Sequence, residues 1–124
     1  MTAIQNGDRY TGVAGVDLTG KQYHLVKLDA NGEVVLAAAA TDNILGTLEV
    51  DGRKGEAVSV ALANGVGSFK VKLAANTAKD AYLTSDASGQ AVVTAVAGDR
   101  VIGRLVKAGV AGEIAEYIKH NEKF

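Results

Sequence analysis

Apolar and polar residues alternate over short stretches of the chain, a pattern typical of β-strands. It is clearest in residues 68–73, where Phe69, Val71 and Leu73 should face the core. The same reading predicts strands, separated by turns, at residues 23–28, 33–38, 43–50, 56–62, 82–85, 90–96, 100–106 and 113–118. These lengths suit strands, and nothing in the pattern predicts more than short helical turns.

An internal repeat connects these strands. Residues 24–61 match residues 81–118 at a constant offset of 57 without a gap, and twelve of the thirty-eight positions are identical. The matched positions include a turn in each copy, Asp29–Gly32 and Asp86–Gly89. They also include one glycine inside a strand of each copy, Gly46 and Gly103. A glycine inside a strand indicates a bulge or a close backbone approach. Two copies are too few for a solenoid. The repeat therefore predicts an all-β fold, a small β-sandwich or barrel-like domain built from two pseudo-symmetric copies of a β unit.

The repeat also suggests how the chain is divided. We expect an N-terminal arm at residues 1–12, a single β domain at residues 13–119 and a C-terminal tail at residues 120–124. The arm is polar and turn-prone, so it should not bury itself well in the core. It nevertheless carries Ile4, Arg9 and Tyr10, whose types suit an interface. The arm is either a disordered terminus or a segment that orders against a partner surface or a neighbouring protomer.

Composition excludes several classes of protein. The net charge is −1, with 13 basic and 14 acidic residues, so there is no basic field to attract nucleic acid. The longest apolar run, Val34 to Ala40, is too short to span a bilayer, so we expect no membrane partner. The N-terminus lacks the regions of a signal peptide, which favours synthesis in the cytoplasm. Cysteine is absent, so thiolate metal sites and disulfides are excluded.

Residues that could carry chemistry are few and scattered. His24 and His120 have no metal-ligand spacing, and His24 is expected on the surface of a strand. Asp29 and Asp86 each begin a turn, where a carboxylate caps backbone N–H groups. No serine lies in a nucleophile elbow, and no glycine-rich segment has the ending of a phosphate loop. We therefore expect no enzyme, no cofactor and no metal.

Several of these segments resemble bacteriophage capsid cement (head decoration) proteins. The segments that carry the resemblance are Val13 to Leu28 with its Lys21-Gln22-Tyr23, Asp29 to Leu36, Ile44-Leu45-Gly46, Gly55 to Val60, Thr84 to Gly89, Val101 to Arg104 and Ala111 to Ile114. The resemblance covers roughly residues 13–118 and consists of turn and strand motifs.

The resemblance implies a structural protein on the outer surface of a phage head, part of the virion. Such proteins bridge neighbouring subunits of the major capsid protein, reinforce the shell and do not touch DNA. They typically form homo-oligomers, often trimers. On this reading Ile4, Arg9 and Tyr10 are the candidate capsid-binding residues. The alternative is a receptor- or glycan-binding module of a phage fibre, a tail or a surface adhesin.

Overall fold

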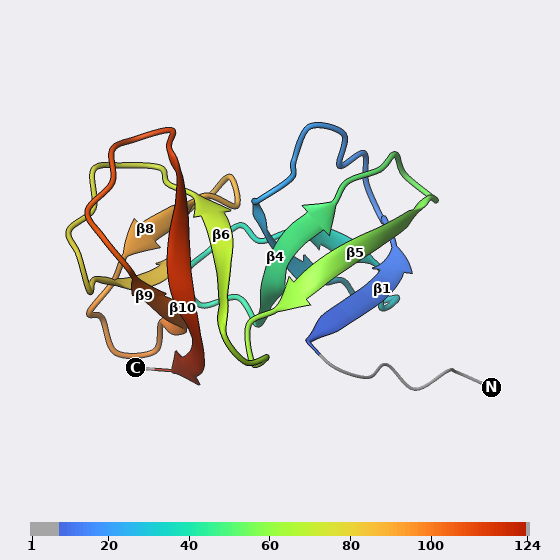
Figure 1. The fold of residues 1–124 in the computed structure, drawn as a ribbon. Helices are drawn as coiled ribbons and strands as arrows, with labels where there is room; N and C mark the ends of the chain where they lie inside the picture. Colours follow the sequence, from blue (N-terminus) through green and yellow to red (C-terminus); the bar gives the residue numbers. More distant parts are fainter. Residues whose placement is uncertain (1–7, 124) are drawn as a thin grey trace.

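Ten strands in two antiparallel sheets form the fold of residues 8–123, which a computed structural model describes (Figure 1). The strands are β1 (Arg9–Val13), β2 (Leu25–Leu28), β3 (Val34–Leu36), β4 (Ile44–Val50), β5 (Ala57–Leu62), β6 (Ser68–Lys72), β7 (Tyr82–Ser85), β8 (Ala91–Val93), β9 (Arg100–Leu105) and β10 (Ile114–Lys123). The predicted all-β class is confirmed. Within residues 8–123 the structure has no helix long and apolar enough to cross a membrane.

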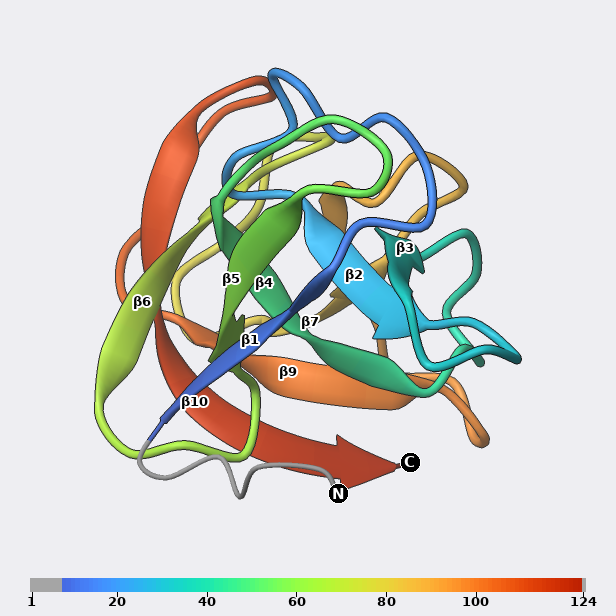
Figure 2. The ribbon, with the colours of Figure 1, turned by 90° about the vertical axis from the view of Figure 1, so that its right-hand side faces the viewer.

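The two sheets have the same topology. The first has the strand order β1-β5-β4-β2-β3 and the second β6-β10-β9-β7-β8. We call β1–β5 the first unit and β6–β10 the second unit. The units lie side by side in Figure 1, and the second lies behind the first in Figure 2. The predicted pair of similar units is confirmed, and it extends further than the sequence repeat, because β1 and β6 hold the same place in their sheets.

Equivalent turns are built in the same way in both units. Asp29 Oδ1 accepts two backbone N–H groups further along its turn, each at 2.9 Å, and Asp86 Oδ1 does the same at 2.8 and 2.9 Å. Gly32 and Gly89 close these turns with φ of 76° and 74°. Their surroundings differ, because the Gly89 carbonyl accepts the N–H of Leu25 from the first unit, at 2.6 Å.

Each sheet curls until its two edges meet. A parallel bridge joins Ala14, just after β1, to Val34 in β3, and the equivalent bridge joins Leu73 to Ala91. The sheets can curl this tightly because their central strands are irregular. The pairing of β2 with β4 shifts register beside Gly46, as expected for a glycine inside a strand. Each unit is therefore barrel-like.

The two units pack through different faces. We call the face of a sheet that lies inside its own curl the inner face, and the opposite face the outer face. In the first unit the inner face carries Val26, Leu48 and Val60, which form one hydrophobic cluster with residues of that unit. The inner face of the second unit carries Leu83, Leu105 and Tyr117, and its cluster also takes in residues of the first unit, which are Leu25, Ala37, Ile44 and Ala63. The second unit thus completes its core with the outer face of the first.

A buried hydrogen bond crosses this contact between the units. The hydroxyls of Thr47 on the outer face of the first unit and Tyr117 on the inner face of the second are 2.8 Å apart. Both residues are fully buried. Burial raises the pKa of Tyr117 to about 12, so its hydroxyl is protonated and available for the bond throughout the neutral range.

The structure departs from the sequence-based picture at both ends of the chain and at one histidine. Residues 9–12, assigned to the arm, form β1 because their backbone pairs with β5. Residues 120–123, assigned to the tail, continue β10 beside β9. His24 was expected on a strand surface but is only 5% exposed, because it precedes β2 where the two units meet. Val71 and Leu73 face the core as predicted, and Phe69 is partly buried against it.

We predict that Gly46→Ala destabilises the domain by about 3 kcal/mol, the upper part of the usual range for overpacking. A Cβ at Gly46 would collide with the backbone carbonyl of Ala61 on the paired strand. Gly32→Ala is the matched control, since its Cβ would meet no atom and only its left-handed φ is unfavourable, at about 1 kcal/mol. Urea unfolding of both variants measures the difference, and equal losses would contradict the assigned close approach.

A double-mutant cycle tests the hydrogen bond between the units. Tyr117→Phe and Thr47→Val should each cost about 1–2 kcal/mol, because each leaves a buried hydroxyl without its partner. The double variant should lose less than the sum of the two, with a coupling of about 0.5 kcal/mol or more. Chemical unfolding of the four proteins gives the coupling, and strictly additive losses would show that the two hydroxyls act independently.

Candidate functional site

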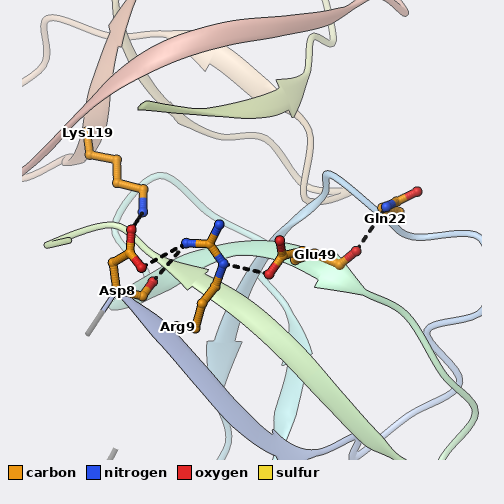
Figure 3. Close-up of polar contacts among 5 residues, drawn as sticks. All are labelled: Asp8, Arg9, Gln22, Glu49 and Lys119. Atoms are coloured by element: carbon orange, nitrogen blue, oxygen red, sulfur yellow. Dashed lines mark hydrogen bonds and ion pairs between the residues drawn. The ribbon is translucent and has the colours of Figure 1, made fainter. Parts of the chain in front are cut away.

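Arg9 lies at the start of β1, where it joins groups from both units (Figure 3). Its Nε donates to Glu49 Oε1 of β4 at 2.6 Å, and its Nη1 lies 3.1 Å from Asp8 Oδ1. The guanidinium carbon also lies 5.2 Å from the ring centroid of Phe69 in the second unit, within the range of a cation–π contact. Arg9 was predicted as a capsid contact. In the structure its guanidinium group contacts Asp8, Glu49 and Phe69 of the same chain.

Lys119 approaches the same group of residues from β10. Its side chain is completely buried, and Nζ lies 3.3 Å from Asp8 Oδ2. The Lys119 ammonium lowers the pKa of Asp8 from its usual value, first by its hydrogen bond and then by its charge. A buried ammonium needs a counter-charge, so the contact ties the residue just before β1 to the last strand of the second unit.

We call Asp8, Arg9, Glu49, Phe69 and Lys119 the clamp. It holds the first unit to the second at their common edge, and Gln22 Nε2 adds a bond to the Glu49 carbonyl at 2.9 Å. Sequence reasoning singled out only Arg9 from this set. Glu49 and Lys119 lie 40 and 111 positions from their partners, so no local spacing in the sequence could have indicated these contacts.

Tyr10 is the other predicted site residue that the structure describes, and it contacts apolar residues instead of the clamp charges. Tyr10, also in β1, is half-buried and packs against the hydrophobic cluster of the first unit. Ile4 lies outside the described residues. The two described candidates, Arg9 and Tyr10, therefore make different contacts, one with charged groups and one with the hydrophobic cluster.

The surface beside the clamp is shallow. A hollow of about 280 Å³ lies where the units meet, next to the tilted ring pair of Tyr23 and Phe69, whose centroids are 5.9 Å apart. It is lined by Tyr23, Ser68, Phe69, Lys70 and Glu116. Among the described residues no group of three or more His, Cys, Asp or Glu side chains could hold a metal ion. The arrangement suits contact with another surface better than enclosure of a small molecule.

The fold has solved counterparts, although no family model and no curated protein sequence matches the chain. The class that the fold of this chain defines is a tandem antiparallel β fold. One of them is the crystal structure of the head fiber gp8.5 N base in bacteriophage phi29. The match has a TM-score of 0.72, covers 94% of this chain and 96% of that chain, and has 19% sequence identity. The two proteins therefore share a fold over almost their whole lengths.

We predict that Asp8→Asn destabilises the protein at neutral pH and that its effect fades in acid. The hydrogen bond from Lys119 lowers the pKa of Asp8 from its usual value in the folded protein, so its carboxylate stabilises the fold above that usual value. This contribution is lost as the pH falls through the lowered pKa, and the wild type then converges on the variant. Urea midpoints recorded from neutral pH into the acid range test this prediction.

A second variant separates the ion pair from the packing around it. Adding Lys119→Met to Asp8→Asn removes the buried ammonium as well, so the double variant should be more stable than Asp8→Asn alone. A constant difference between wild type and Asp8→Asn at every pH would instead mean that the carboxylate charge has no role.

Proposed function

We propose that this protein is a structural component of a bacteriophage head. The observation that carries the proposal is the shared fold, over 94% of the chain, with the base of a phage head fiber. Independent support comes from the turn and strand motifs that resemble capsid cement proteins. The two lines have different origins, because one rests on backbone geometry and the other on short sequence segments.

More specifically, we propose a cement protein that binds the outer surface of the head and bridges subunits of the major capsid protein. The buried contact between the two units supports this role, since a bridge that stabilises a shell must not flex between its two contact points. The shallow surface beside the clamp supports it too, because a capsid offers a broad protein surface. In this proposal the protein acts as a homo-oligomer, with a trimer favoured, has no catalytic activity and binds no nucleic acid.

Ile4, Arg9 and Tyr10 stay candidate capsid contacts within this proposal. Tyr10 is the better placed of the two described residues, because the charged end of Arg9 already has partners inside the protein. Arg9 contributes to the clamp, so a loss of binding in an Arg9 variant must be compared with its loss of stability.

The test is co-sedimentation with undecorated phage heads. Labelled protein should pellet with the heads and saturate at a fixed ratio of copies to capsid subunits. Heads first saturated with unlabelled protein are the matched control and should bind none. Decorated heads should also keep their DNA to a higher temperature than bare heads. If the protein stays in the supernatant with every head tested but binds a glycan array, it is a receptor-binding module instead.

A further inference from the structure

Residues 23–25, which lead into β2, lie where the two units meet, and their backbone is bonded to the second unit at both ends. The Tyr23 carbonyl accepts the N–H of Lys72 in β6, at 2.9 Å. The N–H of Leu25 donates to the Gly89 carbonyl in the turn before β8, at 2.6 Å. We call residues 23–25 the latch, because these two backbone hydrogen bonds cross from one unit to the other.

The latch contains a strained backbone. Tyr23 has a φ of 70°, in the left-handed region that is unfavourable for a residue with a large side chain. Its equivalent in the second unit, Asp80, has a φ of 65°, but aspartate tolerates this region better. Tyr23 is held there from both sides, since its N–H donates to the Leu48 carbonyl at 2.7 Å and its carbonyl accepts the N–H of Lys72. Breaking the second bond would therefore also allow the strain to relax.

The middle residue of the latch is a buried histidine. His24 is only 5% exposed, and its Nδ1 lies 3.4 Å from the Gln22 carbonyl. Burial lowers the pKa of the His24 imidazole from its usual value, and the charges of Lys21 and Lys72 lower it further, against the opposite effect of the Gln22 carbonyl. The neutral imidazole is therefore the form that fits the folded protein.

A protonated His24 would add a third positive charge beside Lys21 and Lys72, in a site with little access to water. β6 contains two lysines and no acidic residue. The acidic residues of the neighbouring segments already have other partners. They are Glu49 with Arg9, Asp42 with Lys27, Asp86 with the N–H groups of its own turn, Asp17 with Thr19, and Asp51 with the N–H of Gly20.

We propose that the latch is a pH-sensitive contact, which joins the two units while His24 is neutral and opens when His24 takes up a proton. Opening breaks the two backbone hydrogen bonds between the units and lets Tyr23 leave its left-handed conformation. A histidine whose pKa is lowered by folding stabilises the closed state above its usual pKa of about 6.5, and this contribution is lost as the pH falls towards the lowered value. The inference goes beyond the proposed function, because it concerns the free protein and does not require capsid binding.

Amide hydrogen exchange of the purified protein tests the latch directly. Between pH about 7.5 and about 5.5, protection of the Leu25 and Lys72 amides should fall several-fold, towards the limit of about tenfold that one proton sets over this range. The Gly15 amide, bonded to Val34 inside the first unit, is the control and should keep its protection. Asp8 does not contribute, because its lowered pKa keeps it ionised throughout. Equal losses at all three amides, or no loss at Leu25 and Lys72, would overturn the inference.

The two histidines of the chain provide a matched pair of variants. His24→Asn removes the titrating group and keeps a nitrogen that can reach the Gln22 carbonyl, so the pH dependence of Leu25 exchange should disappear. His120→Asn, at an exposed position of β10, should retain that dependence. Circular dichroism reports whether each variant is folded. A folded His24→Asn protein that still responds to acid would contradict the proposed role of His24.

An NMR titration of the wild type decides the matter even if His24→Asn fails to fold. The His24 imidazole should titrate below its usual pKa of about 6.5. Lys72→Gln should raise this pKa, because it removes one of the two positive charges that act on the imidazole. Lys70→Gln, on the same strand, is the control and should change it less. A His24 pKa at or above the usual value would overturn the inference, whatever the result of the co-sedimentation test.

Discussion

The fold depends on one contact, the packing of the first unit's outer face into the inner face of the second. Leu25, Ile44 and Ala63 belong to the same buried cluster as Leu83, Leu105 and Tyr117, so the second unit has no complete core of its own. The first unit, in contrast, encloses its cluster with its own residues. We therefore expect the two units to unfold together despite the internal repeat, because removing the first unit would expose Tyr117, the largest fully buried side chain of the second.

The two copies have diverged in ways that the packing explains. In the first unit the parallel bridge joins Ala14 to Val34, and in the second it joins Leu73 to Ala91. Compared with the first unit, the second has the larger Leu73 in place of Ala14 and the smaller Ala91 in place of Val34. The combined side-chain volume at the point where each sheet closes is therefore nearly the same in the two units. Tyr117 replaces the equivalent Val60 only in the unit whose inner face meets Thr47, the residue that satisfies its hydroxyl.

Local features of the fold were predictable from the sequence, and contacts between distant residues were not. The turns at Asp29 and Asp86 follow from carboxylates that bond backbone N–H groups within the same few residues, so a short motif is sufficient to identify them. The burial of His24 and the ion pair of Lys119 arise where the two units meet. The repeat predicted two units but gave no information on which faces they join, because a match between two positions does not show what either of them packs against.

The clamp explains why the first strand lies where sequence composition predicted an arm. The segment before residue 13 has little apolar content, so a core-based argument leaves it outside the domain. Its backbone nevertheless pairs with β5, and Arg9 and Asp8 hold it through charges whose partners lie on β4 and β10. A polar segment can thus be fixed in place when an open sheet edge supplies hydrogen bonds and a buried ammonium needs a carboxylate. In the proposed role, this anchoring presents Tyr10 from a rigid strand at the edge of the first unit, so that a partner surface would meet it at little cost in conformational entropy.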